Sequence, residues 1–138
     1  MVVWRKREDN PWLHAAELVV REIIPEKDKG DAVTCGPGPF SMAGADLVSD
    51  QLLKAGYRNV AFERVEQPIC IGQSMEEAIE FAMALGPAGE IVRLAGDDGE
   101  RLRPQVERAL AGALQEFVQA DGTVRAPSST WIITAQNA

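Results

Sequence analysis

The apolar positions of this chain recur mostly at the three- and four-residue intervals of amphipathic helices, and a few short runs follow the pattern of strands. The helical pattern predicts five helices, over residues 11–24, 47–55, 75–85, 87–94 and 104–120. Strand-like runs cover 1–4, 58–71 and 131–133, and Pro68 indicates that the second is bulged or lies at a sheet edge. The third contains Trp131-Ile132-Ile133, apolar on both faces, so we expect it inside a sheet.

Two of the predicted helices begin with a recognisable signal. Asn10 precedes Pro11, and Asn is a frequent N-cap whereas Pro fits the first turn of a helix. Ser74 is followed three residues later by Glu77. This spacing predicts a capping box, in which each side chain binds the backbone N–H of the other residue.

Proline and glycine predict where regular structure is interrupted. Residues 25–40 contain Gly36-Pro37-Gly38-Pro39 and are interpreted as a loop. Asp97-Asp98-Gly99 is interpreted as a turn. Pro104 is then expected in the first turn of the helix that follows, where its missing N–H costs nothing.

The first strand-like run, Met1 to Trp4, has no turn or cap before it and breaks at once into charged residues. Sheets usually contain about four to six strands. Two full strands and this stub therefore predict an incomplete sheet, as if the chain began inside a larger fold. We expect an α/β chain, α+β when taken alone, that forms a single domain over 1–138. A homodimer through the exposed sheet edge or the first helix would complete the sheet.

Composition disfavours several kinds of function. The chain has 14 Lys and Arg against 21 Asp and Glu, a net charge of −7, which argues against nucleic-acid binding. Its one basic cluster, Arg5-Lys6-Arg7, is followed by Glu8 and Asp9. We interpret the cluster as a solvated connection rather than a phosphate site.

The sequence also indicates a location and argues against metal sites. No apolar run approaches the roughly 20 residues that span a bilayer, and no signal peptide is recognisable, so we expect a cytoplasmic protein. Cys35 and Cys70 would remain thiols there. With one histidine and no Cys-x-x-Cys, a structural zinc site is not expected. Asp97-Asp98 and Glu100 lack EF-hand spacing and favour a solvated turn over a cation site.

Four pieces of the chain stand in a suggestive order: Val2-Val3-Trp4-Arg5, Asn10-Pro11-Trp12, Gly38-Pro39-Phe40, and Leu52-x-x-Ala55-Gly56-Tyr57-x-x-Val60. Together they resemble the C-terminal half of class I S-adenosylmethionine-dependent methyltransferases, in particular the ubiquinone and menaquinone biosynthesis type. The resemblance implies a partial Rossmann-like sheet and a first helix that covers the substrate. It also implies a helical insertion over about 74–120 and a last, antiparallel strand near 130–135.

The same resemblance implies that the methyl-donor site is missing. In that family a glycine-rich turn and an acidic residue of the first half hold the cofactor. This chain has no Gly-x-Gly-x-Gly after an apolar strand, and Pro37 and Pro39 lack N–H donors. No cofactor-binding residue is therefore assigned. We expect the C-terminal part of a small-molecule methyltransferase, inactive alone; the alternative is a non-catalytic module that binds a ligand or a partner.

The region that resembles the substrate cover supplies four expected substrate contacts: Trp12, His14, Phe40 and Met42. Phe81 could join them, and side chains of this kind equally build a plain core. His14 could be a general base, but methyl transfer in such enzymes rests mainly on holding donor and acceptor together. Cys35 and Cys70 have no neighbouring base and are not expected to be nucleophiles. No catalytic or metal-binding residue is assigned.

Overall fold

The structure, a computed structural model, describes residues 1–25 and 38–137. It combines helices with a three-stranded sheet, so the expectation of a mixed helix-and-strand chain is confirmed at the α+β level. Most of the predicted loop over 25–40, and Cys35 with it, lies outside the described residues.

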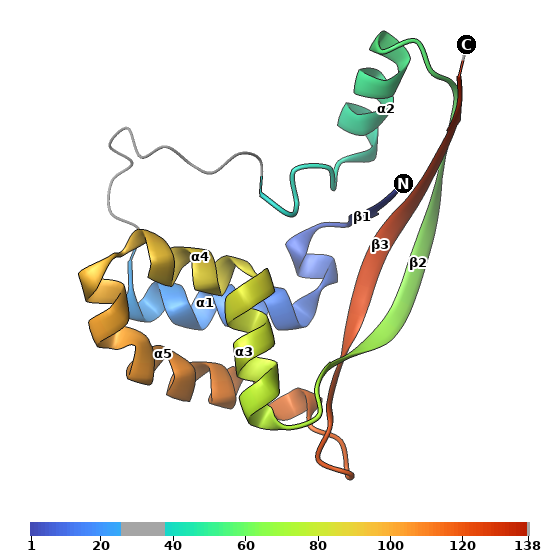
Figure 1. The fold of residues 1–138 in the computed structure, drawn as a ribbon. Coiled ribbons are helices and arrows are strands. Elements are labelled where there is room, and N and C mark those ends of the chain that lie inside the picture. The colour runs from blue at the N-terminus through green and yellow to red at the C-terminus, as the bar shows by residue number, and fades with distance from the viewer. Residues whose placement is uncertain (26–37, 138) are drawn as a thin grey trace. The chain divides into compact units, whose positions relative to one another are not determined.

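The order of elements follows the sequence pattern closely (Figure 1). The elements are β1 (Val2–Trp4), α1 (Pro11–Ile23), α2 (Ala45–Lys54), β2 (Arg58–Gly72), α3 (Met75–Leu85), α4 (Pro87–Leu94), α5 (Asp97–Leu114) and β3 (Val124–Gln136). Short 3-10 helices cover Arg7–Asp9 and Gln115–Phe117. Every predicted helix and strand is present, and the bounds predicted for α4 are those observed.

The contacts divide the chain into two compact units. One, the sheet unit, comprises Met1–Asn10, Val33–Gln67 and Ser128–Ala138; the other, the helical unit, comprises Pro11–Ala32 and Pro68–Pro127. Each is described by itself below. The single-domain interpretation stays a prediction.

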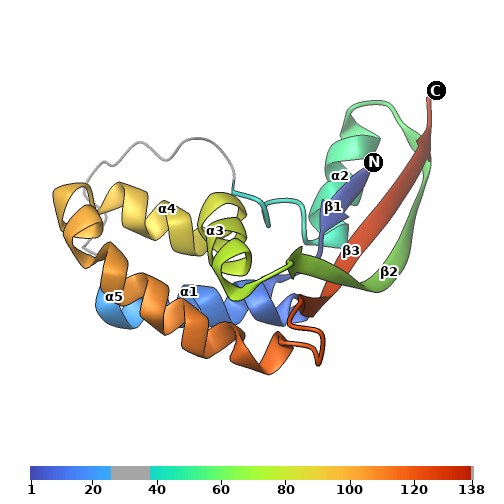
Figure 2. The same ribbon diagram turned by 60° about the horizontal axis from the view of Figure 1, so that its bottom comes forward.

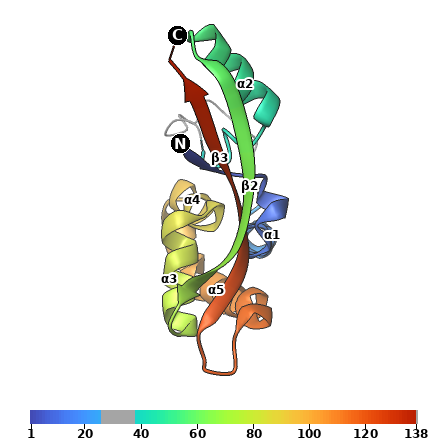
Figure 3. The ribbon, with the colours of Figure 1, turned by 90° about the vertical axis from the view of Figure 1, so that its right-hand side faces the viewer.

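In the sheet unit the strand order is β1-β3-β2, and β1 pairs antiparallel with β3 in the register Val2↔Ile132, Val3↔Trp131 and Trp4↔Thr130. β2 and β3 run side by side in opposite directions (Figure 3). The prediction that the last strand lies inside the sheet is therefore confirmed, as is the edge position of β2. Trp131 anchors one face, because its ring meets Phe62 edge-on at 5.8 Å and its Nε1 donates to the carbonyl of Ala43 at 3.1 Å.

The helical unit is built around a core to which α1, α4 and α5 contribute. The buried side chains of this core are Ala16, Val20, Ile24, Ala88, Val92, Val106 and Leu110. Helices α1 and α5 lie alongside each other (Figure 2). Two glycines allow close approach of helix ends: a Cβ on Gly89 would stand 1.6 Å from the carbonyl oxygen of Met83, and one on Gly99 would stand 2.0 Å from that of Val92. Any side chain at these positions would collide with backbone.

The start of α5 corrects two predictions. Asp97-Asp98-Gly99 is the first turn of the helix and not a separate turn. Pro104 lies inside the helix, on its exposed side, where it leaves the carbonyl of Glu100 without its usual donor. Burial of Gly99 against α4 and of Val106 in the core explains why the helix extends through both positions.

Two capping predictions are partly wrong. Glu77 N–H donates to Ser74 Oγ at 3.3 Å as predicted, but the Glu77 carboxylate accepts from the N–H of Gln73 at 2.9 Å instead of that of Ser74. Asn10 does not cap α1 with its side-chain oxygen. That oxygen accepts from the N–H of Ser129 at 2.9 Å, so the residue ties β3 to the start of the chain.

The last strand begins six residues earlier than the predicted start at 130, at Val124. A tight turn precedes it: Gln119 N–H donates to Thr123 O at 2.7 Å, Gly122 adopts φ +85°, and Asp121 Oδ1 accepts from the N–H of Thr123 at 3.0 Å. Pairing with β2 extends the strand through residues whose own pattern does not predict one.

Candidate functional site

The best-formed polar site of the sheet unit surrounds Arg5, which follows β1. Its guanidinium donates to Ser129 Oγ at 2.8 Å and pairs with Asp9 Oδ2 at 3.3 Å and Glu66 Oε1 at 3.6 Å. It also lies over the Trp131 ring, 4.7 Å from the centroid, a cation–π geometry. We call these five residues the arginine cluster. The Arg5 side chain is only 15% exposed, so the interpretation of this basic stretch as fully solvated is wrong for Arg5.

Asn10 contacts the arginine cluster through Ser129, which belongs to it. Both are buried, and the Asn10 amide donates to the carbonyls of Lys6 and Ser129, each at 3.1 Å, while it accepts from the Ser129 N–H. Arg5 N–H donates to the Ser129 carbonyl at 3.1 Å. The side-chain amide of Asn10 therefore joins the chain start to β3 through both its oxygen and its nitrogen.

The carboxylate of Glu66 is the titratable group of the cluster with a shifted pKa. A side-chain hydrogen bond from Arg64 lowers its pKa below the ordinary value of a glutamate, and the charges of Arg64 and Arg5 and a hydrogen bond from Ser129 lower it further. Glu66 therefore stays ionised at neutral pH.

A pocket of about 350 Å³ opens beside this cluster. Its lining residues are Arg5, Lys6, Asp9, Ala43, Gly44, Ala45, Asp46 and Trp131. Two basic and two acidic side chains together with an indole face suit a small polar molecule. The lining includes no thiol, hydroxyl or imidazole, so its polar groups are carboxylates, an amine, a guanidinium and an indole N–H.

A second depression, of about 420 Å³, lies on the helical unit. Its lining residues are Ile79, Glu80, Met83, Ala84, Gly89, Arg93, Glu100, Arg103 and Glu107. Arg103 pairs with Glu100 at 2.9 Å, and the pKa of Glu100 is lowered by that hydrogen bond. Apolar side chains and charged side chains of both signs thus line this depression.

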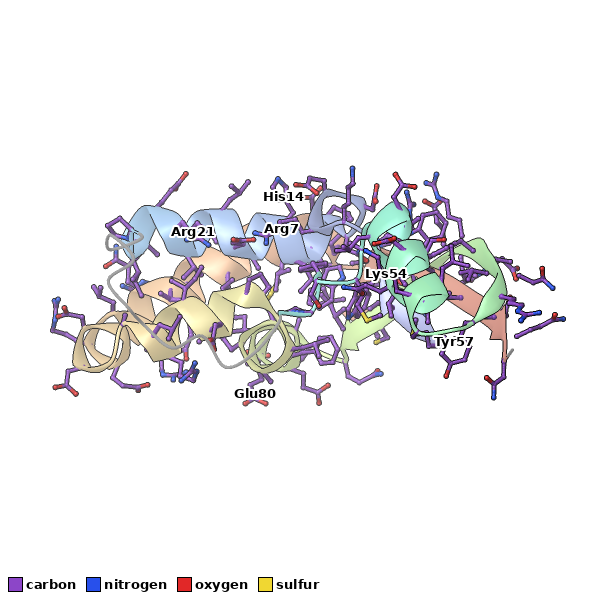
Figure 4. All side chains as sticks on the ribbon, turned by 90° about the horizontal axis from the view of Figure 1, so that it is seen from above. Arg7, His14, Arg21, Lys54, Tyr57 and Glu80 are labelled. Carbon is purple, nitrogen blue, oxygen red and sulfur yellow. The ribbon has the colours of Figure 1, made fainter. Side chains whose placement is uncertain are left out.

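Two of the expected substrate contacts belong to α1. Trp12 is wholly buried, and its ring lies 5.5 Å from that of Phe81 with a 30° tilt. His14, labelled in Figure 4, is half-buried on the same helix. Trp12 Nε1 and His14 Nδ1 are both buried, and neither has a hydrogen-bond partner among the described residues. A buried donor left unsatisfied costs about 1–3 kcal/mol, so these two atoms stand out as places that favour an added polar group.

The other two expected contacts, Phe40 and Met42, lie in the turn before α2 and are half-buried. Arg7 lies over the Phe40 ring at 5.6 Å. Phe40 and Met42 belong to the sheet unit, whereas Trp12 and His14 belong to the helical unit. The four are thus not assembled within either unit, and their role in binding a substrate stays a prediction.

Glu17 is a buried carboxylate that the sequence pattern did not single out. It lies on α1 and accepts from Arg21 Nε and Nη2, both at 2.9 Å (Figure 4 labels Arg21). Both nitrogens of Arg21 bind the same carboxylate oxygen, Oε1 of Glu17. This pairing links two successive turns of α1.

Comparison with known proteins adds no identification, since no family model and no curated protein matches the chain. Over residues 1–25 and 38–137, His, Cys, Asp and Glu side chains form no group of three or more that could hold a metal ion. Among the helices described, none combines the length and apolar character needed to cross a bilayer.

Proposed function

We propose that this chain is the substrate-side, C-terminal part of a small-molecule S-adenosylmethionine-dependent methyltransferase and is inactive without its cofactor-binding part. The observation that carries the proposal is the sheet. Val2, Trp4 and Ile132 lie on the same face of the sheet, and all three side chains are apolar. This face is only partly covered, since Val2 is 65% exposed. An apolar strand that is left open at its edge and on one face belongs to a larger sheet.

Two further features agree with this proposal. The last strand lies antiparallel to the strand stub, as the resemblance implies. The helices α3, α4 and α5 fall between the two long strands, where the resemblance implies an insertion. On this proposal the enzyme is cytoplasmic, and Trp12, His14, Phe40 and Met42 remain its expected substrate contacts.

The residues that the structure describes do not fit the methyl donor. A cofactor cradle requires glycines that admit the ligand against the backbone. The glycines with no room for a Cβ, such as Gly89 and Gly99, are closed by backbone of the chain itself, whereas Gly38 has nothing within 4 Å. No step of methyl transfer is therefore assigned to this chain. Its part would be to hold and orient the acceptor.

Calorimetric titration of the purified chain with S-adenosylmethionine tests this account. We expect no binding tighter than about 100 μM, which corresponds to about −5.5 kcal/mol. Tighter binding would overturn the claim that the donor site is absent. S-adenosylhomocysteine serves as the matched ligand, because a genuine donor site binds both.

A second candidate function is a non-catalytic module that binds a small polar ligand. The pocket beside the arginine cluster favours it, because charged groups of both signs and the Trp131 ring line one concave surface. Trp131 fluorescence during titration with free amino acids tests this. Quenching that saturates with ligand and that Lys6→Ala weakens would support the module. If the fluorescence stays unchanged up to a ligand concentration of about 10 mM, binding with a dissociation constant of about 1 mM or less is excluded, and so is the module.

A further inference from the structure

The depression on the helical unit lies where three helices pack against one another, α3, α4 and α5, and all of its lining residues belong to that unit. On α3 the lining residues Glu80, Met83 and Ala84 follow the spacing of one helical face. α5 contributes a face of the same kind, from Glu100 to Glu107. The volume of about 420 Å³ is within the range of small-molecule sites, about 300–1,000 Å³.

The apolar part of this lining is on α3. Ile79 and Met83 are half-buried and pack against the core of the helical unit, and Ala84 beside them is exposed. The uncovered surface of these side chains is available to the apolar part of a ligand. Methionine also adapts to ligands of different shapes, because its side chain is unbranched and flexible.

The basic side chains of the lining are each matched by a carboxylate of their own helix. Arg93 donates from Nε and Nη2 to the carboxylate of Glu90, at 2.7 and 2.6 Å. Arg103 donates to the carboxylate of Glu100 in the same way, at 3.1 and 2.9 Å. Such bidentate pairing uses the guanidinium edge that would otherwise bind an anionic ligand.

Two carboxylates of the lining have no such partner. The carboxylates of Glu80, labelled in Figure 4, and Glu107 form no hydrogen bond or ion pair with another described residue. The pKa of Arg103 is raised mainly by its hydrogen bond to Glu100, and the charge of Glu107 raises it further, so Glu107 lies near that pair. The first turn of α4, which contains Gly89, adds about half a positive charge. Two carboxylates exceed this, so the depression is negative on balance.

We propose that this depression binds a small organic cation that consists of an ammonium group on an apolar body. The ammonium group pairs with the half-buried carboxylate of Glu107, and Glu80 adds a second negative charge. The apolar body contacts Ile79 and Met83. An anion of the same shape would meet two carboxylates and two guanidinium groups that are already paired, so it is disfavoured.

NMR titration of the full chain with hexylammonium chloride tests the site, because backbone amide shifts both locate the ligand and report that the chain is folded. The depression is open to solvent and ion pairs in water are weak, so we expect a dissociation constant of about 1 mM. The amides of Ala84, Gly89 and Glu107 should shift and saturate together. Hexanoate, with the same apolar chain and the opposite charge, should bind at least tenfold more weakly.

Three charge-removing variants make the test specific to these residues. Glu107→Gln and Glu80→Gln keep the shape of the side chain, and each should weaken hexylammonium binding about three- to fivefold, as expected for the loss of one partly exposed ion pair. Glu63→Gln, at an exposed position of β2 in the sheet unit, changes the net charge equally and should leave the dissociation constant unchanged. No saturable shift at the three amides, equal binding of hexanoate, or equal weakening by Glu63→Gln would overturn the proposal. Unchanged binding in both Glu107→Gln and Glu80→Gln would overturn it as well. The inference does not rest on the proposed function, which the cofactor titration tests separately.

Discussion

Substitution of Gly99 by alanine tests how α4 and α5 meet. A Cβ at this position would stand 2.0 Å from the carbonyl oxygen of Val92 and 3.2 Å from Ala95 Cβ, so the two helix ends must separate. Overpacking of this kind costs about 1–3 kcal/mol, and a contact with backbone belongs at the upper end. Alanine recovers about 1 kcal/mol of helix propensity. We expect a net loss of about 2 kcal/mol in the free energy of unfolding.

Gly112 supplies the matched control, because it lies in the same helix and has nothing within 4 Å of its would-be Cβ. Gly112→Ala should therefore stabilise the chain by about 0.5–1 kcal/mol. Urea unfolding followed by circular dichroism at the helical band measures both, and the two variants should differ by about 3 kcal/mol with an unchanged m-value. Equal stability of the two alanine variants would refute the described packing of α5 on α4.

Two further predictions concern the arginine cluster and its surroundings. Asn10→Ala should destabilise the sheet unit by about 2–3 kcal/mol, because the buried Ser129 N–H loses its acceptor. The control Gln136→Ala, at an exposed position, should change the stability by under about 0.5 kcal/mol. Urea unfolding followed by tryptophan fluorescence compares the two variants. Arg64→Gln should raise the lowered pKa of Glu66 toward 4.5 in a carboxyl NMR titration, whereas Arg103→Gln should raise that of Glu100 and leave Glu66 unchanged. Since the folded-state pKa of Glu66 is lowered, the stability it contributes is present above its ordinary pKa and is lost as the pH falls through the folded value; a titration in which Arg64→Gln has no effect would contradict this cause.

The helices and strands were predictable wherever a local signal agreed with the pattern. Ser74 starts α3 through its own hydroxyl, and Gly86 with Pro87 separates α3 from α4, so these bounds follow from neighbouring residues alone. Pro104 was misplaced because a local rule forbids it inside a helix. The burial of Val106 and Leu110 in the core outweighs that local cost.

The candidate site was much less predictable. Arg5 and Ser129 are 124 positions apart in the sequence, and no spacing rule relates them. Asn10 was noticed as a helix cap, yet its side chain serves β3, which only the three-dimensional pairing reveals. Trp12 and Phe81 were named together as possible substrate contacts, and their rings do lie 5.5 Å apart, but their role in binding stays a prediction. Local signals predict elements, whereas contacts between distant segments build the site.

The most direct test of the central proposal is the intact mass and N-terminal sequence of the natural polypeptide. If this chain is the substrate-side part of a methyltransferase, the natural protein should be well above 15.0 kDa and should carry a Gly-x-Gly-x-Gly turn ahead of Val2. A natural protein of 15.0 kDa that starts at Met1 would contradict the proposal.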